Sequence, residues 1–494
     1  MLKRSILTIL LIATCFCISA QENIRKLSLN EVIDLARDQS FQAILARHQF
    51  MGSYWEYRSY KAHFLPSLTM NSGLVNFNHS ISKYQKQDGS YKYIDNFDNT
   101  TDLEFSLSQN IGLTGGSIFV NSSLQRTDDF GNELTSYLSN PVNFGVRQPI
   151  NGYNRFKWER KIEPLKYEQA QKEYVSAMED VSLRAINLFF DLALAQVNLK
   201  VARLNYSQTD TLFKISQGRY QIGTISQNEL LQMELSYLQA DQALNEAKIA
   251  LEDRKIRLRS FLGFNEKVDF ELHIPDSVPD IKLQYDQVYQ KARDNNPELM
   301  DYERRMLEGQ RNLQQAKAEK GLNADLFASF GLTQKTDTDE IPLAYKDPRN
   351  YQRVSLGLEL PILDWGRREG QFRMAQSQME VIRTSVKQNR IDFERNVFLD
   401  VMRFNLLDEQ FLIARKADTI AQMRYDVARN RFLIGKIDVL DLNIALQDKD
   451  NAKRRYIQAL KDFWTRYYQI RRLTLYDFAD EEELTGEVEE KLIE

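Results

Sequence analysis

The histidines, which most often bind metals and act as general acids or bases, are few in this sequence and widely separated. The four histidines have no spacing that would place two of them on one metal ion; they are His48, His63, His79 and His273. The sequence also lacks a nucleophile elbow, a phosphate-binding loop and a dinucleotide fingerprint. The glycine-rich run at 112–116 is better explained as a hairpin turn than as a phosphate cradle. We therefore predict a protein that is not an enzyme and that needs no cofactor or metal.

The first twenty residues are typical of a secretory signal peptide. Two basic residues precede a mostly apolar run, Ile6–Ile18, and Ser19-Ala20 forms a suitable cleavage site. The run is too short to favour a spanning helix, and the residues before Cys15 and Cys17 fit lipidation poorly. Because both cysteines lie in this segment, the exported chain would have no thiol or disulfide chemistry.

Composition and charge limit the kinds of partner and of membrane segment. The chain has 65 basic and 69 acidic residues. Removing Lys3 and Arg4 with the signal leaves 63 basic residues and a net charge of about −6, which gives no support to nucleic-acid binding. We find no later apolar run of about 18 residues and so predict no spanning helix. An exported chain can still cross a membrane as a β-barrel, whose alternating strands barely raise the mean hydropathy of -0.50.

An internal duplication organises the chain. Residues 27–62 align with 283–318 without a gap, and Arg-Tyr-Gln-Ile-Gly at 219–223 matches Arg-Phe-Leu-Ile-Gly at 431–435. Several matches in the same order indicate two copies of one unit. Each copy has a helix of about 35 residues, a strand region, a very long helix, a glycine turn and a second helix.

The predicted boundaries follow from this order. We predict a signal peptide at 1–20, a first repeat at 21–280, a second repeat at 281–475 and a disordered acidic tail at 476–494. In the first repeat, strands are predicted at about 65–78 and 101–149, helices at 153–217 and 225–263, and then a linker. In the second repeat, strands are predicted at about 324–334 and 351–361, and helices at 283–320, 367–434 and 438–473. Residues 79–100 and 335–350 are predicted to be water-facing loops.

The long helices have the length and spacing of coiled coils. Residues 153–217 contain one proline, Pro164, and no glycine, and residues 371–434 contain neither. At 1.5 Å per residue, each stretch would extend about 95 Å. Apolar residues recur at steps of three or four, as in Leu183, Ile186 and Phe190, which predicts a seam that faces neighbouring helices.

The strand regions alternate between apolar and polar residues. Leu103, Phe105 and Leu107 interleave with polar residues, which predicts a sheet with one apolar face. Each copy supplies too few strands to close a barrel, so closure needs several subunits. The segment 98–141 of the first copy is longer than its counterpart and carries an extra hairpin signal. It either adds strands to the barrel or forms a hairpin outside it.

Together these features resemble the TolC-like outer-membrane efflux protein family, from about Leu27 to Leu475. One motif is Leu-Pro-Ile-Leu-Asp-Trp-Gly-Arg-Arg at 360–368, similar to the family's strand-to-helix junction, with a weaker counterpart at 148–152. The other is a helix-hairpin turn that occurs at 219–229 and again at 431–441.

The resemblance implies an α+β membrane protein with long helices in a periplasmic α-barrel and four strands per subunit in a β-barrel shared by a trimer. It implies a passive exit duct in the outer membrane, serving a tripartite efflux pump or secretion system. The partners would be a periplasmic adaptor and an inner-membrane transporter. The adaptor would dock at the tip turns, which contain Gly223, Thr224, Gly435 and Lys436.

Acidic residues at the tips are the candidate pore constriction. Counted from Gly435, Asp441 occupies the place where the family's second turn carries a constricting acid. Asp438 lies one helical turn earlier, and Glu229 is the matching acid of the first repeat. In a trimer, carboxylates that converge on the axis would favour cations and bind divalent ions. The alternative for Asp438 is that it only caps the helix that follows.

The junction motif supplies candidates for the membrane interface. Trp365 would anchor the chain at the interface, and Arg367 and Arg368 would pair with lipid phosphates. Alternatively, the two arginines only solvate the first turn of the long helix. Glu359 and Glu104 are candidates for the lumen face.

Two other functions are consistent with part of the pattern. A periplasmic adaptor also has a long helical hairpin, but the duplicated hairpins and the barrel-like strands count against it. A structural coiled-coil protein of the cell envelope would explain the helices and leave the strands without a role. The sequence does not identify the transported cargo, because the pump selects it.

Overall fold

The computed structural model describes residues 24–150, 152–264, 269–275 and 277–485. The predicted signal peptide at 1–20 and residues 486–494 of the predicted tail lie outside these residues. The chain divides into two compact units. The helical unit comprises the described parts of residues 1–50, 171–297 and 392–494, and the sheet unit comprises those of 51–170 and 298–391.

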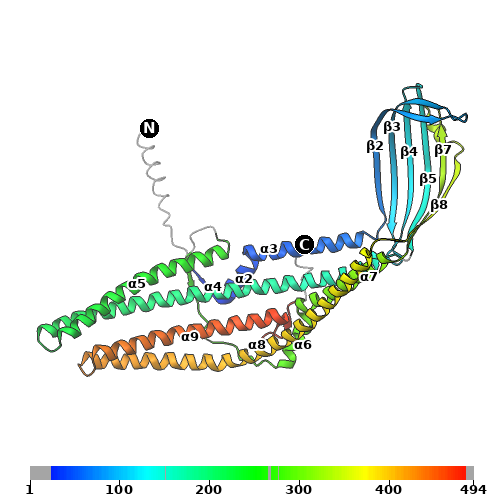
Figure 1. Cartoon of the computed structure of the whole chain (residues 1–494). Coiled ribbons are helices and arrows are strands. Elements are labelled where there is room, and N and C mark those ends of the chain that lie inside the picture. The colour runs from blue at the N-terminus through cyan, green and yellow to red at the C-terminus, as the bar shows by residue number, and fades with distance from the viewer. Residues whose placement is uncertain (1–23, 151, 265–268, 276, 486–494) are drawn as a thin grey trace, which may run out of the picture. The chain divides into compact units, whose positions relative to one another are not determined.

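The sheet unit contains one six-stranded antiparallel sheet with the order β2-β3-β4-β5-β7-β8 (Figure 1). Its strands are β2 (Ser67–Gln85), β3 (Tyr91–Asn110), β4 (Ser117–Asp129), β5 (Leu134–Ile150), β7 (Asn323–Thr336) and β8 (Arg349–Glu359). The expectation of four strands per subunit is therefore wrong, because the first repeat supplies four strands to this sheet and the second supplies two. The segment 98–141 lies in β3, β4 and β5 and so adds to the sheet. The loop predicted at 79–100 is also wrong, since most of it extends β2 and β3.

Alternation of side chains gives this sheet one apolar face. Leu68 lies opposite Leu107 and Met70 opposite Phe105 in the pairing of β2 with β3. A 3₁₀-helix, Ile341–Tyr345, follows β7 and packs against β5, where the Ser139 hydroxyl donates to the carbonyl of Ala344. The predicted loop at 335–350 is thus partly ordered by contacts with the sheet.

Two long helical hairpins continue from the strands. They are formed by α4 (Arg155–Gln221) with α5 (Gln227–Phe261), and by α8 (Arg367–Leu433) with α9 (Val439–Thr474). The predicted seam is buried at Leu183, Ile186 and Phe190. One stretch of α4 is long and apolar enough to cross a membrane by length and composition, contrary to the expectation from sequence. Half of that stretch is buried inside the fold, as in a core helix.

The first helix of each repeat is broken at one aligned position. The repeats open with α2 (Leu29–Gln39) and α3 (Phe41–Ala62), and with α6 (Tyr285–Asn295) and α7 (Pro297–Lys320). At the breaks, the backbone N–H of Ser40 donates to Ala36, and that of Asn296 donates to Ala292. The single helix predicted at 283–320 is therefore wrong, because Pro297 restricts Asn296 to extended backbone.

Short strands tie the chain segments of the helical unit together. β1 (Ile24–Leu27) pairs in parallel with β6 (Asp269–Leu272), which lies in the linker between the repeats. β9 (Tyr476–Asp477) pairs with β10 (Glu482–Glu483). The disordered tail predicted from residue 476 is thus wrong as far as residue 485, because Asp477 is buried and anchors this segment.

Candidate functional site

Both hairpin tips are built from the same backbone turn. Gly223 has φ 74° and Gly435 has φ 72°, a left-handed conformation that a residue without Cβ adopts at low cost. In each turn the residue after the glycine donates its N–H to a carbonyl five residues back. Thr224 bonds to Arg219 and Lys436 to Arg431, both at 2.9 Å. The glycines therefore end α4 and α8 as C-caps.

Each following helix begins with a side-chain cap. Ser226 Oγ accepts from the N–H of Glu229 at 3.3 Å, and the Glu229 carboxylate accepts from the N–H of Ser226 at 2.7 Å. At the second tip, Asp438 Oδ1 accepts from the N–H of Asp441 at 2.9 Å. The capping role of Asp438 is confirmed, and it is compatible with a pore role because its side chain stays exposed.

The two tips bring Glu229 and Asp438 near each other. Hydrogen bonds from the backbone and then the hydroxyl of Ser226 lower the pKa of Glu229, while the charge of Asp438 acts to raise it. Asp441 is exposed in the first turn of α9. The structure thus places the three predicted acids at the ends of adjacent hairpins, where Asp438 and Asp441 are exposed and Glu229 is partly exposed.

The side chain of Arg219 connects the first tip to the second by non-covalent contacts. Its guanidinium donates to the carbonyl of Leu433 at 2.9 Å and lies 5.6 Å from the centre of the Phe432 ring. Behind it, residues from α4, α5, α8 and α9 form one apolar cluster: Leu212, Met233, Tyr425, Phe432, Val439, Leu442 and Ala445. The tips therefore share one core and are held as one piece.

A groove of about 510 Å³ lies farther along the same helices, between α4, α5 and α9. Its α5 wall carries small residues at helical spacing, Ala240, Ala243 and Ala247. Its floor is polar: the Asn205 amide donates to Asp450 at 2.6 Å. Small side chains allow close approach of another helix.

The strand-to-helix junction begins α8. The Asp364 carboxylate accepts from the backbone N–H groups of Gly366 at 3.0 Å and Arg368 at 3.1 Å, so it caps the helix. Trp365 has φ 54° and is 89% exposed, a strained and unshielded position for a large aromatic residue. In the first repeat Asn154 plays the part of Asp364 by accepting from the N–H of Lys157.

The two arginines of the junction differ. Arg368 donates to the Glu359 carboxylate at 2.8 Å and to the carbonyl of Glu319 at 2.7 Å. Its guanidinium thus binds acceptors of the protein itself, whereas Arg367 is exposed. Of the two predicted phosphate ligands, Arg367 is thus the exposed one, and Trp365, the predicted interface anchor, is exposed as well.

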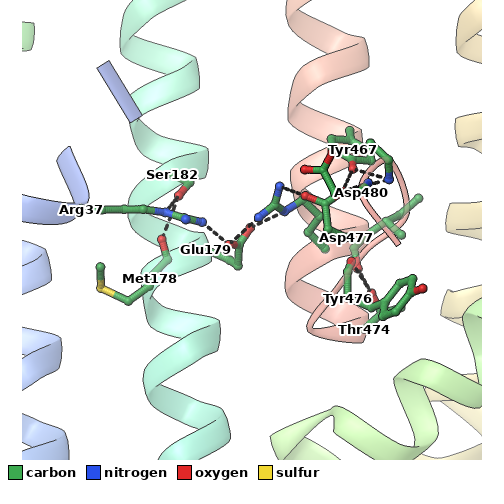
Figure 2. Close-up of polar contacts among 12 residues, drawn as sticks. Arg37, Met178, Glu179, Ser182, Tyr467, Thr474, Tyr476, Asp477 and Asp480 are labelled. Atoms are coloured by element: carbon green, nitrogen blue, oxygen red, sulfur yellow. Dashed lines mark hydrogen bonds and ion pairs between the residues drawn. The ribbon is translucent and has the colours of Figure 1, made fainter. Parts of the chain in front are cut away.

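Sequence reasoning missed a buried charge cluster in the helical unit (Figure 2). Glu179 of α4 is 2% exposed and accepts from Arg37 of α2. From the other side, Arg471 of α9 approaches Glu179 with Nε 3.2 Å from Oε2. Arg471 also pairs with Asp477, which accepts from the Tyr467 hydroxyl. The cluster joins both repeats and the segment after α9.

Burial and hydrogen bonding shift the pKa values of two groups in this cluster. Burial acts to raise the pKa of Asp477, but the Tyr467 hydroxyl and the Arg471 guanidinium together hold it below its usual range. Burial, followed by the hydrogen bond to Asp477, raises the pKa of Tyr467.

No group of three or more His, Cys, Asp or Glu residues within the described ranges has a metal-binding arrangement.

One comparison with known proteins matches most of the chain to a family. The sequence model described as "Outer membrane efflux protein" matches residues 112–264 and 288–474. A search of curated proteins found no match.

Solved structures of outer-membrane channels share the fold. The Campylobacter jejuni CmeC channel is 14% identical with a TM-score of 0.66, covering 94% of this chain and 88% of that one. The channel OprN is 12% identical with a TM-score of 0.64, covering 90% and 89%. VceC from Vibrio cholerae is 13% identical with a TM-score of 0.61, covering 91% and 95%.

Proposed function

Because this chain belongs to the outer membrane efflux protein family, and is an exit duct of the outer membrane with a large periplasmic portion, we propose that it works as a homotrimer served by a periplasmic adaptor and an inner-membrane transporter. The family is one of channels rather than of enzymes. Membership of the chain in this family also decides against the two alternatives from the sequence, a periplasmic adaptor and a structural coiled-coil protein.

The observation that carries the trimer is the open sheet. Among the described residues, β2 and β8 pair on one side only. Every backbone N–H and C=O group of a sheet that crosses lipid must be hydrogen-bonded, so neither edge strand can stay unpaired. Further copies of the same chain supply the missing edges, and a threefold ring closes with one kind of contact.

At the tips, the acids and the turns are assigned separate roles. Asp441, with Asp438 and Glu229 beside it, would form a ring of carboxylates around the axis that favours cations. Gly223, Thr224, Gly435 and Lys436 would form the surface on which the adaptor docks. The apolar core that the two tips share and the hydrogen bond from Arg219 to Leu433 support this assignment, because a docking surface needs fixed geometry.

At the other end of α8, Trp365 and Arg367 would lie at the inner edge of the membrane. An exposed indole and a nearby guanidinium suit the headgroup region, where one side is apolar and the other wet. We also propose that the chain consists of two repeats preceded by a signal peptide at 1–20.

Light scattering of the detergent-purified protein tests the oligomer, and we expect the mass of three chains of 57.9 kDa, less any signal peptide removed. Photo-crosslinkers placed at 222–226 and 434–438 test docking, with the co-expressed adaptor as the target. The same crosslinker at Ser355, on β8, is the matched control. A monomer that forms no pore in planar bilayers would refute the trimer, and equal crosslinking from all three places would refute docking at the tips.

A further inference from the structure

The hairpin formed by β2 and β3 is an integral part of the sheet. β3 pairs with β4 without interruption from Asp98 opposite Asp129 to Asn110 opposite Ser117. The edge of β4 is therefore already occupied along its whole length. A barrel that closed through β4 would first have to break this ladder, so the hairpin cannot be set aside at no cost.

The apolar face continues across all six strands. In register, Leu68 lies opposite Leu107, Leu107 opposite Val120, and Val120 opposite Phe144. Phe144 in turn lies opposite Phe330 of β7, and on β8 the same face carries Val354 and Leu356. These apolar side chains are exposed in the single chain, with Leu68 at 69% and Leu356 at 58%. One continuous lipid-facing surface therefore includes the hairpin of β2 and β3.

Strand directions allow the two edges to meet. Each neighbouring pair in the sheet is antiparallel, and the number of strands is even. β8 therefore runs opposite to β2, and β8 of one copy can add to β2 of the next as an ordinary antiparallel pair. β8 has 11 residues, enough to cross the hydrocarbon layer at the usual tilt.

From these relationships we infer that the barrel has eighteen strands, six from each of three copies, and a wide lumen. The inference rests on the proposed trimer and replaces the twelve strands that four per subunit would give. The occupant of each free edge is thus the opposite edge of a second copy of this chain.

Barrel geometry converts the strand count into a size of cargo. Strands spaced about 4.8 Å apart and tilted by about 40° each take about 6 Å of circumference. Eighteen strands give a backbone diameter of about 36 Å, against about 24 Å for twelve. Side chains occupy about 5 Å of each wall, which leaves openings of about 26 Å and about 14 Å. The outer-membrane portion would therefore admit solutes about 20 Å across, which a twelve-stranded barrel excludes.

Size-graded labelling of a cysteine on the polar face measures this opening. Ser355 of β8 lies between Val354 and Leu356 and so faces the predicted lumen. Because Cys15 and Cys17 are the only cysteines of the chain and precede the exported part, Ser355→Cys introduces a single reactive thiol. Intact cells are treated with a small maleimide and with maleimide polymers of increasing diameter.

The matched control is a chain without the hairpin of β2 and β3. Ser67 and Ser108 are paired, and the Gln109 amide donates to the carbonyl of Phe64 at 3.2 Å, so the ends of the hairpin lie close together. Deleting 67–110 and joining Pro66 to Ile111 leaves four strands, again an even number.

We expect the small maleimide to label both chains and polymers about 20 Å across to label only the full chain. Deleting the hairpin removes residues from the entrance of the barrel and so cannot obstruct it. If only smaller polymers label the deleted chain, the cause is therefore a narrower barrel with fewer strands. Equal cut-offs would overturn the wide barrel and leave the duct intact. Failure of the small maleimide to label either chain would overturn the duct as well.

Disulfide scanning covers the case in which the deleted chain does not insert. Cysteines at 68, 70 or 72 of β2 are combined with cysteines at 354, 356 or 358 of β8 in the full chain, and oxidation is followed by gel electrophoresis. At least one combination should give covalent dimers and trimers. Cross-linking only between β8 and cysteines at 118, 120 or 122 of β4 would show closure through β4 and refute the inference.

Discussion

Glu179 and Arg471 stand 292 positions apart in the sequence and form a buried ion pair, with Arg471 Nε 3.2 Å from Glu179 Oε2. Glu179 belongs to the first repeat and Arg471 to the second. Arg37 and Asp477 extend the pair on either side. Within the helical unit, the two repeats are thus held together by buried charges as well as by apolar packing.

Glu179→Gln should destabilise the helical unit by about 3 kcal/mol, because it leaves two arginines near each other without the buried carboxylate between them. The midpoint of chemical unfolding, followed by circular dichroism in detergent, measures the effect. Asp180→Asn is the control, since Asp180 pairs with Arg472 at the surface, where the side chains are 55% and 44% exposed. It should cost at most about 1 kcal/mol. Similar losses in both variants would contradict a structural role for the buried pair.

Asp477 should make the protein sensitive to acid. Its pKa is lower in the folded chain than in the unfolded one, so its contribution is complete above the unfolded pKa of about 3.9 and is lost as the pH falls through the folded pKa. The difference in unfolding midpoint between wild type and Asp477→Asn should be constant near neutral pH and should shrink below about pH 4. A difference that stays constant down to pH 2 would mean that the carboxylate does not act through its charge.

Gly223 and Gly218 separate backbone strain from steric fit. An added Cβ would meet nothing within 4 Å at either position, but only Gly223 has a positive φ, of 74°. Gly223→Ala should therefore cost about 1 kcal/mol. Gly218→Ala, inside α4, should gain about 0.5–1 kcal/mol. Thermal unfolding of the two variants measures both, and equal effects would show that the turn does not hold Gly223 in the left-handed region.

The tips could be predicted from the sequence because their chemistry is local. A glycine that ends a helix, followed within three residues by Ser226 or Asp438, specifies a turn and a cap without any long-range contact. The break at Asn296 was also signalled locally, by Pro297, and was missed because the apolar pattern continues across it.

The buried cluster and the full sheet could not be predicted in the same way. Nothing near Arg471 in the sequence distinguishes it from exposed arginines such as Arg472, because its partner lies in the other repeat. Residues 79–100 are rich in Asn, Asp, Lys and Tyr, as in a loop, and become strands because β2 and β3 extend each other's ladder beyond the rest of the sheet. Both features depend on pairings that the local pattern does not encode.

Neutralising the tip acids should change ion selectivity without unfolding the tip. Asp438→Asn keeps a cap, because asparagine accepts from the N–H of Asp441 as aspartate does. Together with Asp441→Asn, it removes six carboxylates from the proposed ring of a trimer. In planar bilayers we expect weaker block by divalent cations and lower cation selectivity. Glu252→Gln, an exposed acid farther along α5, is the control and should leave both unchanged. Unaltered block in the double variant would remove these acids from the constriction, while altered block in the control would show that the effect comes from overall charge.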